Sequence, residues 1–302
     1  MKTMEDPYTI DLTHEGAAPP DAASERATGR ATRVAGLVLI GLAAFVGLFL
    51  LYLFGASRIV EIRSQHLLTP EFRALTQQGP ASVADWQPSV GQPVALLSIP
   101  TIGVQKIVVE GTSSSDLTHG PGHLRGSPLP GRPGNSVIAG RRTTFGAPFR
   151  DLGTLHPGNL ILVTTGQGAF TYAVKTIERV VPGQTDVIGP STTNELTLVT
   201  STPAHTAAGR LVVIATLTTA PAPGPATVTT VVPADETGLA GEPGATGPLI
   251  VGLELLVAAL FAWAWYRKRI SPRVARLLMT PVVVALLWGV FGLLARLLPA
   301  TL

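Results

Sequence analysis

The sequence contains no cysteine among its 302 residues. A chain without a thiol forms no disulfide and has no cysteine nucleophile, so thiol catalysis is excluded. Charged residues are also scarce, at 14% of the chain, whereas about a quarter is usual in soluble proteins. Together with 46% hydrophobic residues and a net charge of only +3, this composition indicates membrane segments and predicts no nucleic-acid partner.

Three apolar runs are long enough to cross a bilayer, which takes about 20 helical residues. They cover residues 34–54, 248–266 and 277–298. We expect three transmembrane helices, with the cytoplasmic membrane as a partner. We expect the first to be retained, because it exceeds the apolar core of a cleaved signal peptide and lacks a small-residue cleavage pattern.

The loop between the second and third runs, residues 267–276, carries five basic side chains: Arg267, Lys268, Arg269, Arg273 and Arg276. A cluster of this kind beside membrane spans marks a cytoplasmic loop. With three spans, the N-terminal segment is then predicted to be cytoplasmic. The long stretch between the first and second spans is predicted to be extracellular.

Three further segments carry little sign of a packed core. Residues 1–33 mix acidic, Pro, Ala and Thr residues without periodicity, and this composition predicts a disordered cytoplasmic tail. Residues 55–90 have an irregular helical pattern interrupted by Pro70 and predict an extracellular juxtamembrane stalk. Residues 219–247 are rich in Pro, Gly, Ala and Thr and predict an extracellular linker.

Residues 91–218 differ from these segments in their sequence pattern, which consists of short apolar runs divided by glycine and proline. Such runs with regular turn signals predict an all-β sandwich or barrel. The fifth run is long enough to bend into two strands, so seven or eight strands are expected. The runs are 94–99, 104–109, 136–139, 160–164, 169–181, 196–200 and 211–217.

Two motifs in this region are distinctive. Residues 196–203 read LTLVTSTP, a buried strand ending in the hydroxyl of Ser201, and the next strand begins with the guanidinium of Arg210. Upstream, residues 134–144 read GNSVIAGRRTT.

Both motifs resemble the signatures of sortases, the cell-surface cysteine transpeptidases of Gram-positive bacteria, and in particular the actinobacterial class E or D-like members. Those signatures read TLxTC, with an arginine opening the next strand, and GNxVIAGHRTT. Further matches lie at residues 120–123, 130–135 and 145–152. The resemblance covers about residues 91–218 and implies a mainly β fold, an eight-stranded closed β-barrel.

The chain departs from the family pattern at two of three catalytic positions. The resemblance places Ser201 at the cysteine, Arg141 at the histidine and Arg210 at the arginine. A serine hydroxyl needs an adjacent general base, and a guanidinium does not release its proton in proteins. We therefore predict a catalytically inactive sortase homologue that serves as a binding or assembly subunit at the cell envelope, with an envelope protein or peptide as partner.

Two alternatives stay open at this point. One is a working transpeptidase or hydrolase in which Ser201 is the nucleophile and His123 or His205 is the base. The simpler interpretation, which we prefer, is that both histidines are polar loop residues without a catalytic role. The other alternative is a structural membrane protein whose barrel is an inherited spacer.

The two arginine positions also predict a ligand class. If Arg141 and Arg210 both approach Ser201, with Arg142 beside them, their guanidiniums suit a carboxylate or a phosphate. The opposing interpretation has Arg141 extending to solvent. The histidines lack metal-ligand spacing, so neither a metal nor another cofactor is expected.

Overall fold

The computed structural model describes residues 22–77, 86–181, 184, 186–206, 208–224, 236, 239–269 and 271–302. The expected tail lies outside the described residues up to position 21. The same holds for positions 78–85 of the expected stalk, and for 225–235, 237 and 238 of the expected linker. The chain divides into two compact units, Met1–Leu48 and Phe49–Leu302.

The first unit is helical where it is described. Helix α1 spans Ala22–Leu51 and so includes residues 22–33, which the sequence favoured as disordered. A π-helical turn, Tyr52–Ala56, leads into α2, Ser57–Gln77, which belongs to the second unit. Helix α2 continues through Pro70, although a proline inside a helix removes one backbone hydrogen bond.

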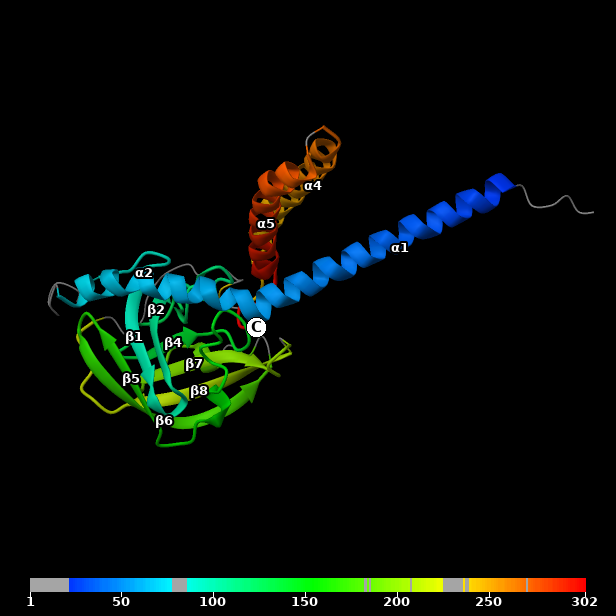
Figure 1. Ribbon diagram of the computed structural model, residues 1–302. Helices are drawn as coiled ribbons and strands as arrows, with labels where there is room; N and C mark the ends of the chain where they lie inside the picture. The colour runs from blue at the N-terminus through cyan, green and yellow to red at the C-terminus, as the bar shows by residue number, and fades with distance from the viewer. Residues whose placement is uncertain are drawn as a thin grey trace, which may run out of the picture. The chain divides into compact units, whose positions relative to one another are not determined.

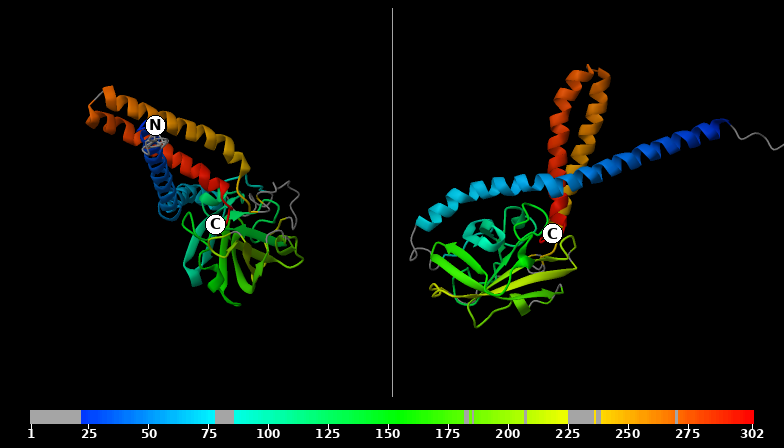
Figure 2. Two further views of the ribbon diagram at one scale, coloured as in Figure 1. Left: turned by 90° about the vertical axis from the view of Figure 1, so that its right-hand side faces the viewer. Right: turned by 60° about the horizontal axis from the view of Figure 1, so that its bottom comes forward.

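Among the described residues, three helices are long and apolar enough to cross a membrane, by length and composition: Thr32–Gln77, Pro243–Arg269 and Pro272–Leu297. The last two contain α4, Thr246–Arg269, and α5, Pro272–Leu297. Helices α4 and α5 run side by side, as both views of Figure 2 show. These helices match the three apolar runs found in the sequence.

Within residues 93–217, the described residues of the second unit form a closed β-barrel of eight strands, and the expected fold is confirmed (Figure 1). The order around the barrel is β1-β2-β3-β4-β7-β8-β6-β5. The strands are β1 Pro93–Ile99, β2 Val104–Glu110, β3 Gly122–His123, β4 Asn135–Ala139, β5 Leu160–Thr165, β6 Gly168–Val180, β7 Glu195–Thr202 and β8 Gly209–Leu217.

Each of the seven expected runs forms a strand, and β3 is the addition. Strand β3 has two residues, which is too short to show an alternation of apolar and polar side chains in the sequence. Strand β6 remains one strand instead of two, because a register shift between Val174 and Thr176 bends it without ending its pairing with β8.

Strands β4, β7 and β8 bury both of their faces. Successive strand residues point to opposite faces, so Leu198 packs in the barrel core while Val199 packs in a second apolar cluster outside it. That second cluster also contains Leu239 and Ala300, which come from segments beyond the barrel. The outward face of these three strands is thus covered, and Ser201 lies on it, two residues after Val199.

Candidate functional site

The antiparallel pair β7 and β8 places Ser201 directly opposite Arg210 in the strand register. Both are buried, with 0% and 9% of their surface exposed. The Ser201 Oγ hydroxyl donates a hydrogen bond of 2.9 Å to the backbone carbonyl of Thr301. An Arg210 Nη donates to the Thr301 hydroxyl oxygen at 3.4 Å. Burial lowers the pKa of Arg210.

Gly140 fixes the direction in which the chain leaves β4. A Cβ at this position would lie 2.5 Å from the Phe149 ring, closer than any side chain tolerates. The Gly140 N–H donates to the Val199 carbonyl, and its own carbonyl accepts a 2.8 Å hydrogen bond from the Thr200 hydroxyl. These bonds hold the two arginines that follow at a defined place beside β7.

Arg141 turns away from Ser201 into the protein. Its guanidinium donates to the backbone carbonyls of Ser114 and Leu117, at 2.7 and 3.2 Å, and to the Thr144 hydroxyl at 3.2 Å. The same group stacks over the Phe145 ring, 4.7 Å from its centroid. Only 1% of the residue is exposed, so it does not reach solvent.

The electrostatics of Arg141 suit a structural cation. Burial lowers the pKa of Arg141 to about 9, which still leaves the guanidinium protonated at neutral pH. A group that keeps its proton near neutrality accepts none from a serine hydroxyl. Its partners named above are uncharged acceptors, and no described hydrogen bond joins it to Ser201 or Arg210.

Arg142 is the arginine that contacts the site. Its guanidinium donates to the backbone carbonyl of Ser201 at 2.7 Å, and its backbone N–H donates to the Thr301 carbonyl at 3.1 Å. Its Nε is buried without a hydrogen-bond partner among the described residues. The cations next to Ser201 are therefore Arg142 and Arg210.

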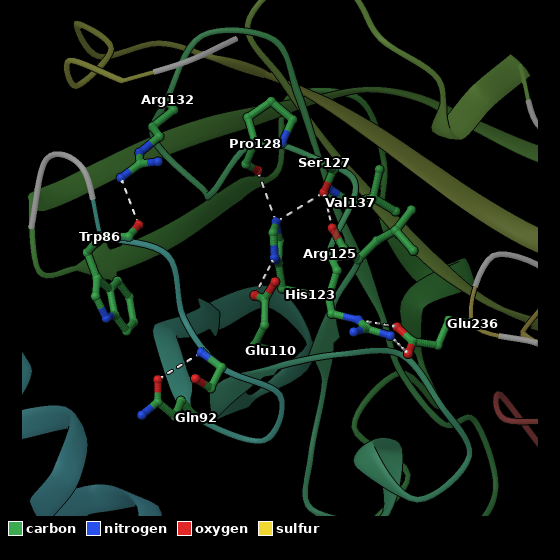
Figure 3. Close-up of polar contacts among 12 residues, drawn as sticks. Trp86, Gln92, Glu110, His123, Arg125, Ser127, Pro128, Arg132, Val137 and Glu236 are labelled. Atoms are coloured by element: carbon green, nitrogen blue, oxygen red, sulfur yellow. Dashed lines mark hydrogen bonds and ion pairs between the residues drawn. The ribbon is translucent and has the colours of Figure 1, made fainter. Parts of the chain in front are cut away.

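His123 belongs to β3 and is buried, with its ring between Glu110 and Pro128 (Figure 3). Its Nδ1 lies 2.7 Å from a Glu110 carboxylate oxygen, and its Nε2 lies 3.0 Å from the Pro128 carbonyl oxygen. The Ser127 hydroxyl is also 3.0 Å from Nε2. Acceptors on both ring nitrogens favour the doubly protonated imidazolium.

The pKa of His123 agrees with that geometry. Burial alone would lower the pKa, but the charge and hydrogen bond of Glu110, with the Pro128 carbonyl, raise it above its ordinary value overall. A protonated imidazolium engaged at both nitrogens is not placed to deprotonate Ser201.

His205 lies in the turn between β7 and β8 and is exposed. Its ring meets the Phe54 ring edge-on, with centroids 6.1 Å apart. The structure thus brings Ser201, Arg210 and Arg142 together, whereas Arg141 and His123 are engaged elsewhere. Neither histidine hydrogen-bonds to Ser201 in the part of the chain that the structure describes.

Thr301 is the site residue that sequence reasoning missed. The prediction ended the third span at residue 298 and gave the next four residues no role. One signal was present: if the barrel and the end of the third span share a side of the membrane, those residues are free to meet the barrel. Among the described residues, no group of three or more His, Asp or Glu side chains is arranged to hold a metal ion.

Comparison with known proteins places these features in a family. The sequence model of the sortase domain matches residues 97–218, which include Arg141, Ser201 and Arg210. Sortase D of Bacillus subtilis is 34% identical over 105 residues, covering 35% of this chain and 52% of the relative. The chain belongs to the sortase family.

Two actinobacterial sortases are also similar. Sortase SrtE1 of Streptomyces coelicolor is 35% identical over 153 residues, which cover 45% of this chain and 42% of the relative. The solved structure of sortase E from Streptomyces avermitilis is 34% identical, covers 43% of this chain and 91% of that chain, and has a TM-score of 0.40. The sortase-family chain thus spans about half the length of the curated relatives it matches.

Proposed function

We propose that this sortase-family protein is catalytically inactive and acts at the cell envelope as a membrane-anchored binding or assembly subunit. Its barrel lies outside the cytoplasmic membrane, held by one span before it and two after it. Its partner is an envelope protein or peptide that the barrel binds without cleaving.

The surroundings of Ser201 support inactivity. A serine becomes a nucleophile when an adjacent base takes its proton. The hydrogen-bond partner of the Ser201 hydroxyl is the Thr301 carbonyl, which accepts a hydrogen bond but does not take up the proton. The position that resembles the catalytic histidine holds Arg141, whose guanidinium is engaged with backbone carbonyls. The proposal rests on this pair of contacts: Ser201 bound to a carbonyl oxygen, and Arg141 engaged away from Ser201.

Two observations support the orientation. The five basic residues between α4 and α5 favour a cytoplasmic loop. Residues after α5 contact the barrel directly, as in the bond between Ser201 and Thr301. A chain that leaves the barrel and crosses the membrane twice returns to the side of the barrel, so three spans are consistent with this contact.

A working enzyme with Ser201 as nucleophile is the second candidate, and one contact favours it. The Ser201 hydroxyl and the Arg142 N–H converge on one peptide carbonyl oxygen. The Arg142 N–H is a donor of the kind that stabilises charge in acyl transfer, and as nucleophile the Ser201 oxygen would turn from the carbonyl oxygen to the carbonyl carbon.

Turnover separates the two candidates. The full chain in detergent micelles is incubated with peptides that carry the sorting motifs cleaved by sortases, and products are followed by chromatography. We expect no more cleavage than with Ser201→Ala, with Thr192→Ala as an exposed control. Cleavage by the parent and Thr192→Ala chains that Ser201→Ala abolishes would instead establish the second candidate.

An anion remains a proposed ligand of the same cleft, now at Arg142 and Arg210. The unpartnered Nε of Arg142 supports it. Sulfate should then raise the melting temperature more than chloride at equal ionic strength. The increment should shrink in Arg142→Ala and Arg210→Ala but not in the exposed control Arg150→Ala. Equal increments in all three variants would remove the anion from the proposal.

A further inference from the structure

The five residues after α5, Leu298 to Leu302, lie on the outward face of β4, β7 and β8. The C marker stands at the barrel in both views of Figure 2. Ala300 and Thr301 are each 0% exposed, which is unusual for a segment that belongs to neither the barrel nor a helix.

Thr301 is held through its peptide carbonyl. That oxygen accepts from the Arg142 N–H at 3.1 Å and from the Ser201 hydroxyl at 2.9 Å. The Thr301 hydroxyl oxygen accepts from Arg210 at 3.4 Å. One residue of the segment is therefore bound by the ends of three barrel strands, β4, β7 and β8, at the positions where the sortase resemblance places catalysis.

The neighbours of Thr301 are bound as well. The Ala300 N–H donates to the Leu239 carbonyl at 3.1 Å. The Leu302 carbonyl oxygen accepts from the Thr144 hydroxyl at 2.9 Å, and the Leu298 carbonyl oxygen accepts from the Ser114 hydroxyl at 3.3 Å. Hydrogen bonds along the length of the segment, and not one contact, fix its register on the barrel.

Side-chain size matters at Ala300. Its methyl group packs in the apolar cluster that contains Val199, Val212, Leu239 and Leu117. A close-packed surface of this kind accepts a small side chain and excludes a large one. The barrel therefore contacts both the backbone and the side chains of this segment.

We propose that residues 298–302 of the same chain occupy the cleft at Ser201 as a built-in ligand. While the segment is bound, the cleft is closed to other peptides, and α5 is tied to the barrel. This holds whether or not Ser201 is reactive, so it stands apart from the proposed inactivity.

Single-cysteine reporters test it, because the chain has no cysteine of its own. Thr301→Cys and Ser201→Cys are made separately in the full chain, in lipid nanodiscs, and labelled with a membrane-impermeant thiol reagent. Thr192→Cys, at an exposed position, is the reference. Both reporters should label at least about tenfold more slowly than the reference, because labelling waits for the segment to leave.

Two substitutions at Ala300, one that displaces the segment from the cleft and one that keeps it bound, give the matched comparison. Ala300→Trp overfills the apolar cluster, so it should speed labelling of Ser201→Cys at least about tenfold. Ala300→Gly keeps the fit and should leave the slow labelling in place. The acetylated and amidated peptide Leu-Pro-Ala-Thr-Leu should restore protection in the Ala300→Trp chain, whereas a scrambled peptide of the same composition should not.

Three results would overturn the proposal. Labelling of Thr301→Cys at the rate of Thr192→Cys would mean that the segment is not held. Slow labelling of Ser201→Cys in the Ala300→Trp chain, with fast labelling of Thr301→Cys there, would mean that the barrel itself buries Ser201. Failure of the peptide to protect would mean that the cleft does not bind the sequence of residues 298–302. Labelling reports access and not turnover, so none of these outcomes bears on whether the parent protein cleaves peptides.

Discussion

Two adjacent arginines have opposite roles in this barrel. Arg141 and Arg142 follow β4 one after the other, but their guanidiniums bind different parts of the protein. Arg141 binds the Ser114 and Leu117 carbonyls, while Arg142 reaches the Ser201 carbonyl. From the sequence, Arg141 was the first candidate for the site because it matches the histidine position of the family motif. The direction of each side chain depends on backbone details that the motif does not contain.

Arg141 should be a structural residue. Arg141→Ala leaves buried carbonyls without a donor, so it should lower the free energy of unfolding by about 2–4 kcal/mol. The exposed Arg150→Ala is the control and should change it by less than about 0.5 kcal/mol. Urea unfolding of the full chain, followed by circular dichroism, measures both. Equal effects would contradict a structural role for the buried guanidinium.

The His123–Glu110 pair predicts a pH dependence of stability. The folded-state pKa of His123 is raised above its ordinary 6.5. A raised histidine pKa contributes stability that is fully present below the unfolded pKa and lost as pH rises through the folded pKa. The free energy of unfolding should therefore fall over a pH interval that begins near 6.5 and extends through the raised folded-state pKa.

The variant His123→Gln isolates this effect. Gln keeps polar atoms near Glu110 and Pro128 but has no proton to lose in that range. Its free energy of unfolding should be flatter across the same pH interval. The pKa of His119 is lowered by burial, so its titration lies below the interval. An identical slope in parent and variant would show that another group is responsible.

At the scale of elements, periodicity predicted strands well and irregular pieces poorly. The seven longer strands have apolar runs that are bounded by glycine and proline. Strand β3 has two residues, and its place depends on backbone pairing with β2 and β4. Helix α2 was expected as an irregular stalk because Pro70 breaks its pattern, but packing of Phe72 and Leu75 against Ile107 of β2 stabilises it.

Gln65 joins α2 to the barrel in a way that no periodicity shows. Its side-chain amide accepts from the Ile107 N–H at 2.8 Å and donates to the Ile107 carbonyl at 3.0 Å. It thereby pairs with β2 much as a neighbouring strand would. Helix α2 lies along β1 and β2 of the barrel (Figure 1).

Removing this amide should loosen the α2–β2 contact. Gln65→Ala leaves a buried N–H and carbonyl at Ile107 without these partners, so it should cost about 1–3 kcal/mol of stability. Gln105→Ala, at an exposed position of β2, is the matched control and should be nearly neutral. Hydrogen exchange at the Ile107 amide should accelerate in the first variant alone. Unchanged exchange there would show that the side-chain pairing contributes nothing.

At the scale of the whole molecule, the proposed arrangement places the barrel outside and the α4–α5 loop inside. A reporter enzyme that is active only outside should therefore be active when fused at residue 120 and inactive when fused at residue 270. A reporter active only in the cytoplasm should give the opposite pattern. Cytoplasmic activity at residue 120 would reverse the orientation and would remove the cell envelope from the proposed function.

The fold and the family could be read from the sequence, but the occupied cleft could not. Two motifs located Ser201 and Arg210, and the strand register then placed them opposite each other. Thr301 is 100 positions from Ser201 in the chain. No local pattern predicts a contact across such a separation, because it depends on how α5 ends relative to the barrel.

The central claim, a sortase-family barrel that has lost its chemistry, is tested most directly by intact-mass analysis of the full chain with the cleft opened. The Ala300→Trp chain is mixed with sorting-motif peptides, with Ala300→Trp/Ser201→Cys as the comparison that carries a thiol. A thiol is the intrinsically stronger nucleophile near neutral pH, so an adduct confined to the Ser201→Cys chain is compatible with the account. The account predicts no added mass on the chain that retains Ser201. A covalent adduct on Ser201 itself, absent in Ala300→Trp/Ser201→Ala, would contradict it.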